Sequence, residues 1–149
     1  MASPSPWGTL RSVFVVGVSL NYLWELAQAP LYAGLVAYTA AVFWHCFTAS
    51  LGDGIMVLLI FLVGRILLHE WSWFERPGIP GYSIMFGTGL SLAVVVELVA
   101  VYLLERWQYT GAMPTLPGLR IGLVPIAQML LLPPLIFRIV AVFNSKTKA

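Results

Sequence analysis

Three acidic side chains lie inside long apolar stretches of the chain, where ionisable groups are rare. Glu25 and Asp53 lie among apolar residues and glycines, and Glu97 interrupts the otherwise apolar run 92–104. A charged side chain near the centre of a bilayer costs about 2.5–3.5 kcal/mol on insertion scales, and such residues usually have a function. We expect at least one of the three acids to be protonated near neutral pH. A protonated acid beside a carboxylate is suited to general acid–base catalysis.

Further polar and aromatic groups accompany these acids. Four residues recur at intervals of four, three and four and therefore share one face of a helix: Asn21, Glu25, Gln28 and Tyr32. Aromatic rings such as Trp24 and Tyr32 could stabilise a cation through its attraction to their faces. The side chains that we expect to bind a substrate are Asn21, Trp24, Gln28, Tyr32, His45, Arg106, Trp107 and Gln128.

Two of these residues allow a second interpretation. His45 is either a proton partner of the acids or a capping residue at the interface. Arg106 either pairs with an anionic headgroup or diphosphate, or anchors its helix at the membrane surface. We expect no metal and no cofactor, because the sequence has no Glu-x-x-His pair of the kind used by carboxylate-bridged metal bundles and Cys46 is its only cysteine. Motifs of serine hydrolases, phosphate-binding loops and dinucleotide-binding enzymes are missing from the sequence.

One segment resembles a known family. Asn21-x-x-Trp24-Glu25, followed by Tyr32, resembles the Asn-x-x-Trp-Glu segment of the small membrane-embedded terpene cyclases. The resemblance implies that Glu25 is the acid that protonates an epoxide or an alkene. It also implies a second carboxylate from a later helix, a role that Asp53 or Glu97 would fill. The match covers part of one span, and members of that family are longer, with more spans.

The composition indicates the class of protein in which these residues lie. Of the 149 residues, 60% are hydrophobic and 9% are charged, whereas soluble domains have about 25% charged residues. So few charges cannot cover a soluble surface, so we predict an all-α, polytopic transmembrane helix bundle forming a single domain over residues 1–149. The net charge of +2 does not suggest nucleic-acid binding. The expected partner is the lipid bilayer.

Four membrane spans fit the hydrophobic pattern best, and five are the alternative. The four predicted spans cover residues 12–32, 44–68, 83–106 and 120–143. With five spans, a helix at 31–50 would be followed by a tight turn at Gly52-Asp53-Gly54, since Asp-Gly is a strong turn signal. That turn would leave 55–68 as a short span. In the last span, Pro133 and Pro134 remove two amide donors and so free two carbonyl groups.

The four-span pattern places the polar residues at a common depth. Counted from the outer end of its span, each acid lies seven to nine residues in, and Gln128 lies eight residues in. At about 1.5 Å per residue, these positions are about 10–14 Å below the outer boundary. The sequence therefore predicts that acids from separate helices converge near the non-cytoplasmic leaflet.

The loops give an expected orientation. With four spans, Arg11, Arg76, Lys146 and Lys148 fall on one side, so the positive-inside rule predicts that both termini are cytoplasmic. We read residues 1–8 as a short tail and not a signal peptide. The glycines and prolines of 69–82 predict an irregular loop, and its aromatic residues suit the headgroup region: Trp71, Trp73, Phe74 and Tyr82.

Three functions are compatible with these features. The first is a membrane enzyme in which Glu25, Asp53 and Glu97 carry out acid–base chemistry, an isomerisation or a cyclisation, on a lipidic or isoprenoid substrate. The second is a non-catalytic subunit or assembly factor of a larger membrane complex, in which Gly87 and Gly89 would contact a partner helix. The third is a small proton-coupled transporter, which would require a homo-oligomer.

Overall fold

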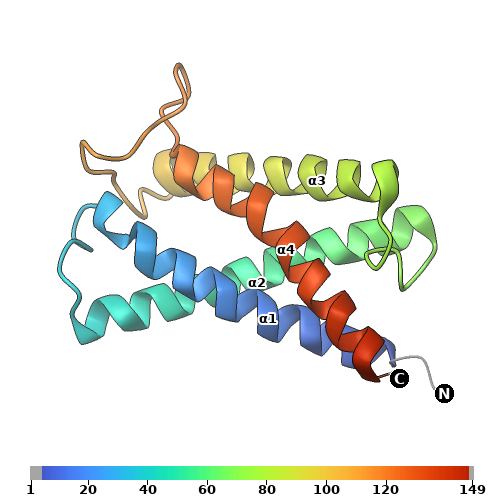
Figure 1. Cartoon of the computed structure of the whole chain (residues 1–149). Helices are drawn as coiled ribbons and strands as arrows, with labels where there is room; N and C mark the ends of the chain where they lie inside the picture. Colours follow the sequence, from blue (N-terminus) through green and yellow to red (C-terminus); the bar gives the residue numbers. More distant parts are fainter. Residues whose placement is uncertain (1–4, 148–149) are drawn as a thin grey trace.

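The computed structural model describes residues 5–147 and is helical throughout its regular structure. The elements are α1 (Pro6–Gln28), a 3-10 turn η1 (Ala29–Leu31), α2 (Ala40–Leu68), α3 (Gly78–Leu98), a π-helical extension η2 (Val99–Leu103) and α4 (Leu123–Thr147) (Figure 1). The predicted all-α bundle is confirmed. The start of the predicted N-terminal tail, residues 1–4, and the basic residue Lys148 lie outside the described part of the chain.

Three of the described helices are long and apolar enough to cross a membrane: Ala40–Leu68, Gly78–Leu103 and Leu123–Ser145. Large apolar side chains such as Ile66 and Leu131 are 67% and 60% exposed on their outer faces, as expected for residues that face lipid. The helix α1, which contains most of the predicted first span, has 23 residues but falls short in hydropathy because its polar face lowers the average.

The second helix settles the choice between four and five helical segments. α2 runs unbroken for 29 residues, and Asp53 lies near its middle, so there is no turn at Gly52-Asp53-Gly54. The glycine at 54 serves close packing instead: a Cβ there would lie 2.6 Å from Cγ2 of Val18 on α1, and Gly17 stands opposite. The five-segment alternative is therefore excluded by the continuity of α2.

The connection between α2 and α3 differs from the prediction of an irregular loop over 69–82. α3 already begins at Gly78, because Pro80 lies in its first turn, where a helix needs no amide donor. Trp73 and Phe74 are each 3% exposed and pack with Phe61 and Phe137 in the core, so their predicted place among lipid headgroups is wrong. The indole of Trp73 donates a hydrogen bond to the Phe61 carbonyl at 3.2 Å, which satisfies its polar atom inside the bundle.

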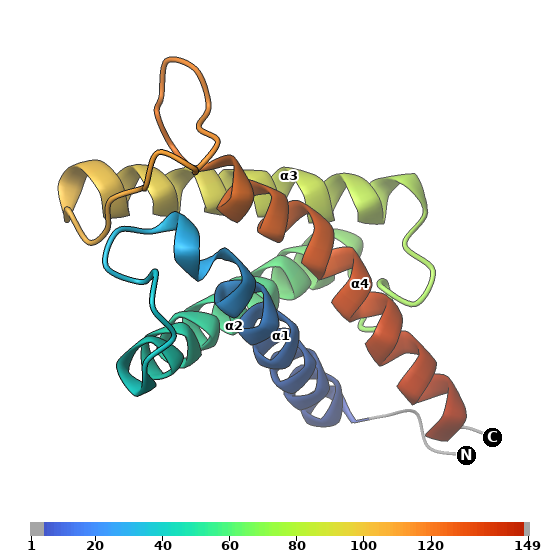
Figure 2. The ribbon, with the colours of Figure 1, turned by 60° about the vertical axis from the view of Figure 1, so that its left-hand side comes forward.

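The arrangement of the helices leaves room at one end of the bundle. α1 packs along α2, while α4 packs between α1 and α3 (Figures 1 and 2). α2 and α3 meet near the connection 69–77 and diverge toward their other ends (Figure 1). The loop between η2 and α4 partly covers this end by bonding to the segment that follows α1. Ala33 N donates to the Gln108 carbonyl and Thr110 N to the Leu31 carbonyl, each at 2.9 Å.

Candidate functional site

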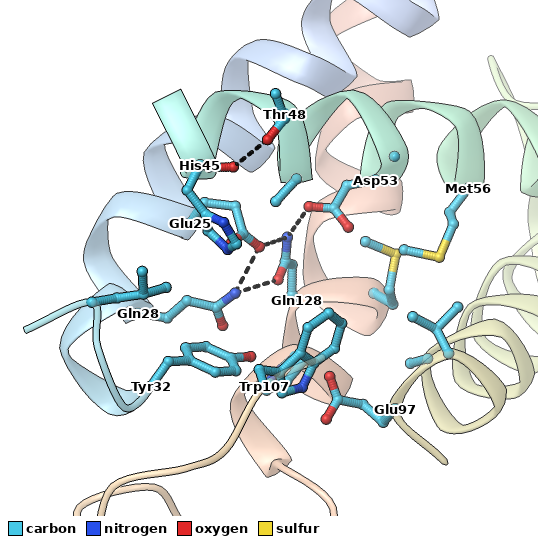
Figure 3. A pocket seen from close by; sticks show the side chains of 17 residues that line it. Glu25, Gln28, Tyr32, His45, Thr48, Asp53, Met56, Glu97, Trp107 and Gln128 are labelled. Atoms are coloured by element: carbon cyan, nitrogen blue, oxygen red, sulfur yellow. Dashed lines mark hydrogen bonds between the residues drawn. The ribbon is translucent and has the colours of Figure 1, made fainter. Parts of the chain in front are cut away.

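A cavity of about 340 Å³ lies at the open end of the bundle. It is lined by Glu25 from α1, Asp53 from α2, Glu97 from α3 and Gln128 from α4 (Figure 3). These are the four residues that the common depth predicted to converge. The walls between them are mostly apolar and include Met56, Ala93, Val96 and Met129.

The side chain of Gln128 connects three helices at the centre of the site. Its amide nitrogen donates to Asn21 Oδ1 at 2.8 Å and to Asp53 Oδ2 at 2.9 Å. Glu25 Oε1 lies 3.4 Å from the same nitrogen. An amide group has two hydrogens, so the two shorter contacts use both of them. Gln128 and Asn21 are almost fully buried, and this bond between them joins α4 to α1.

Gln28 holds the Glu25 carboxyl group in place. Its amide nitrogen donates to Glu25 Oε1 at 2.7 Å and to Gln128 Oε1 at 3.1 Å (Figure 3). The indole of Trp24 in turn donates to Gln28 Oε1 at 3.2 Å. Every amide hydrogen of Gln28 and Gln128 thus has an acceptor. A fully satisfied buried network of this kind fixes the orientation of its members.

Glu25 and Asp53 form a carboxyl pair. Oε1 of Glu25 and Oδ2 of Asp53 approach the same amide nitrogen of Gln128, at 3.4 and 2.9 Å. Two carboxyl groups from different helices therefore lie side by side at one wall of the cavity.

Glu97 lies on another wall and has a different partner. Its carboxyl group accepts a short hydrogen bond from the Tyr109 hydroxyl, which itself accepts from Gly122 N at 2.9 Å. Burial and the contact with Glu97 raise the pKa of Tyr109 above its ordinary value, so the hydroxyl stays protonated as a donor. Glu97 shares the cavity with the carboxyl pair but is held by the loop that precedes α4.

The remaining predicted residues divide into lining and supporting groups. Tyr32, His45 and Trp107 line the cavity together with Gln28. Asn21 and Trp24 do not line it, and act as hydrogen-bond partners of the two glutamines. The exposed side chain of Arg106 lies outside the lining, because the chain leaves η2 there and turns Trp107 inward. Among residues 5–147, no group of three or more His, Cys, Asp or Glu side chains could hold a metal ion.

No pattern in the sequence indicates that Tyr109 belongs to the site. Its contact with Glu97 depends on how the loop folds back: Tyr109 forms an isolated β-bridge with Tyr32, and their rings are 5.7 Å apart. No periodic pattern connects a loop residue to a helix twelve positions earlier, so only the folded chain reveals this partner.

The cavity opens on the side where α2 and α3 diverge. His45, Thr48 and Gly52 of α2 line it and are also exposed at the outer surface of the bundle. A Cβ at Gly52 would have no neighbour within 4 Å, so this position can take a larger side chain.

Replacing Gly52 by Leu is expected to obstruct this opening while leaving the bundle intact. The added side chain has free space at its base, and Leu is favoured over Gly in a helix by about 0.8–1 kcal/mol. We expect weaker ligand binding with an unchanged or slightly raised melting temperature. Thermal unfolding in detergent and ligand binding are the two measurements. A variant with full binding would show that ligands do not pass Gly52.

The segment that resembles the terpene cyclases takes part in this site. Glu25 faces the cavity, while Trp24 and Asn21 hold the two glutamines that surround it. The three residues of the motif therefore act in one network. Comparison with family models, with curated proteins and with solved structures finds no match to this chain.

Proposed function

We propose that this chain is an integral membrane enzyme that isomerises or cyclises a lipidic isoprenoid by proton transfer. One observation carries the proposal: two carboxyl groups from different helices, Glu25 and Asp53, approach the same amide nitrogen at the wall of a mostly apolar cavity. Ligand sites are typically apolar concavities of about 300–1,000 Å³ with a few placed polar groups. The resemblance of the Glu25 segment to the terpene cyclases supports the same chemistry.

The proposed reaction begins with protonation of the substrate. The O–H bond of the Glu25 carboxyl group breaks, a C–H bond forms on an alkene carbon, and a carbocation remains on the substrate. The Asp53 carboxylate then removes a proton from a neighbouring carbon, which creates a new double bond. Transfer of that proton back to Glu25 through the contact between the two groups restores the starting state. In a cyclisation, a second double bond attacks the cation before the proton is lost.

Other residues of the cavity favour the charged intermediate. The rings of Tyr32 and Trp107 lie on the wall opposite the carboxyl pair (Figure 3), and an aromatic face attracts a cation more strongly when water is excluded. Glu97 adds a carboxyl group on the third wall. Apolar walls of Met56, Ala93 and Met129 keep water from capturing the carbocation.

The proposal includes a membrane topology. α1 would cross the bilayer as a fourth span because its polar face is covered by α2 and α4, which leaves apolar residues such as Leu23 toward lipid. Both termini would then lie on the cytoplasmic side, as the basic residues indicate.

Solvent deuterium tests the reaction directly. Membranes containing the protein would be incubated in D2O with ten- and fifteen-carbon prenyl alcohols, and products analysed by mass spectrometry. Protonation at carbon is expected to place a solvent-derived deuterium in an isomerised or cyclised product, without added cofactor. Products lacking deuterium, or the same products from membranes without the protein, would reject the proposed acid chemistry.

A further inference from the structure

Tyr32 places an unused hydroxyl group in the cavity. The residue is 7% exposed and lines the cavity, and its hydroxyl points inward (Figure 3). The backbone amide of Tyr32 donates to the Ala29 carbonyl, but no hydrogen bond of its hydroxyl is found among residues 5–147. A tyrosine hydroxyl carries a proton near neutral pH and can therefore act as a donor.

Trp107 adds a second unused donor beside the first. Its ring packs edge-to-face against Tyr32, with centroids 6.2 Å apart and planes at 87°. Its indole nitrogen is buried near the Glu97 carboxyl group, without a hydrogen-bond partner of suitable geometry (Figure 3). Buried donors in native proteins are nearly always paired, so the unpaired indole N–H of Trp107 indicates a missing acceptor beside the Tyr32 hydroxyl.

On the opposite wall, which carries Gln28 and Gln128, the hydrogen-bond donors are already paired. The amide hydrogens of Gln28 and Gln128 are all engaged with Glu25, Asp53, Asn21 and each other. The Tyr109 hydroxyl is likewise engaged with Glu97. A ligand oxygen would therefore find its donors at Tyr32 and Trp107, whereas an apolar part of the ligand would lie toward the carboxyl pair.

The size of the cavity limits what it encloses. The volume of about 340 Å³ lies at the lower end of the about 300–1,000 Å³ that is typical of ligand pockets. The cavity therefore suits a small ligand or one end of a longer one. A longer chain would extend through the opening between α2 and α3 into lipid.

We propose that Tyr32 and Trp107 form an oxygen subsite, which binds a hydroxyl, ether or carbonyl oxygen at one end of an isoprenoid ligand. The two donors hold the oxygen, and the chain runs past Met56 and Met129 toward Glu25 and Asp53. The isoprenoid nature of the chain rests on the proposed function. Binding of the oxygen itself requires no turnover.

Three saturated ligands test the subsite without any reaction. They are the saturated ten-carbon isoprenoid alcohol, its methyl ether and the hydrocarbon of the same skeleton, none of which has a double bond to protonate. Binding of the tritiated alcohol to the full chain in lipid nanodiscs would be measured, with the other two as competitors and empty nanodiscs as the correction for lipid partitioning. We expect the alcohol and the ether to bind about 2- to 12-fold more tightly than the hydrocarbon, as one net hydrogen bond provides.

Ring-preserving variants locate the donors. Tyr32→Phe and Trp107→Phe are each expected to reduce the preference for oxygen, and the double variant to abolish it. Trp44→Phe and Tyr82→Phe, at positions 67% and 46% exposed and outside the cavity, are matched controls that should retain it. Equal binding of the three ligands by the unmodified protein, a measurement that needs no variant, would overturn the subsite. So would an unchanged preference in the double variant.

The outcome also separates the subsite from the proposed function. A preference for oxygen together with no deuterium incorporation would reject the enzyme and retain the subsite. Deuterium incorporation with equal binding of the saturated ligands would retain the enzyme and reject the subsite.

Discussion

Glu25→Gln is expected to lower the rate of product formation by about 10²- to 10⁴-fold, the range that general acid–base residues contribute. The amide matches the carboxyl group in size but cannot release a proton to an alkene. Turnover of prenyl substrates in membranes measures the effect. Glu70→Gln is the matched control, because Glu70 is an exposed residue beyond the end of α2 and bonds only to Ser72 among the described contacts.

Turnover of Asp53→Asn, alone and combined with Glu25→Gln, tests whether the two carboxyl groups act together. If Glu25 and Asp53 act as one unit, the double variant should be about as slow as either single variant, since the effects of residues that act together are not additive. Multiplicative losses would show that the two carboxyl groups act independently. Unchanged turnover in Glu25→Gln would remove this residue from the mechanism.

Gly89→Ala has the largest expected effect on stability. A Cβ at this position would lie 2.4 Å from the carbonyl oxygen of Met129 on α4. Pro133 cannot donate to that carbonyl, so the oxygen projects against α3, and backbone atoms cannot move aside as a flexible side chain would. Overpacking of this kind typically costs about 1–3 kcal/mol, which exceeds the gain of about 0.8–1 kcal/mol from replacing Gly in a helix.

Gly87 supplies the control for this prediction. It lies on the same helix two residues earlier, and a Cβ there would have no neighbour within 4 Å. Gly87→Ala should therefore raise the melting temperature slightly, whereas Gly89→Ala should lower it. Thermal unfolding of both variants in the same detergent measures the two melting temperatures. A rise in both would mean that α3 and α4 are not in close contact at Met129.

The position of each acid along its helix could be predicted from the sequence. A helix rises by a constant amount per residue, so Glu25, Asp53, Glu97 and Gln128 could be placed at one depth by counting. The helical class also followed from composition, because a chain in lipid must satisfy its backbone within each segment. Both inferences use properties of one segment at a time.

Which acids pair with each other was decided by the tertiary structure. Pairing depends on how each helix is rotated and how close it lies to its neighbour, and these follow from contacts between segments, such as Gly17 against Gly54 and Gly89 against Met129. In the structure, Glu25 and Asp53 approach the same amide nitrogen of Gln128, whereas Glu97 accepts a hydrogen bond from the Tyr109 hydroxyl.

Residues outside the helices show the same division. Trp73 and Trp107 have side chains that suit either a membrane surface or an apolar interior, so residue type alone does not place them. The turn after α2 buries Trp73 in the core, and the loop before α4 turns Trp107 into the cavity. The sequence by itself determined a helical membrane protein with a buried layer of acids, whereas only the fold of its connections decided which donors and aromatic rings surround that layer, because loop conformation depends on the contacts of the assembled bundle.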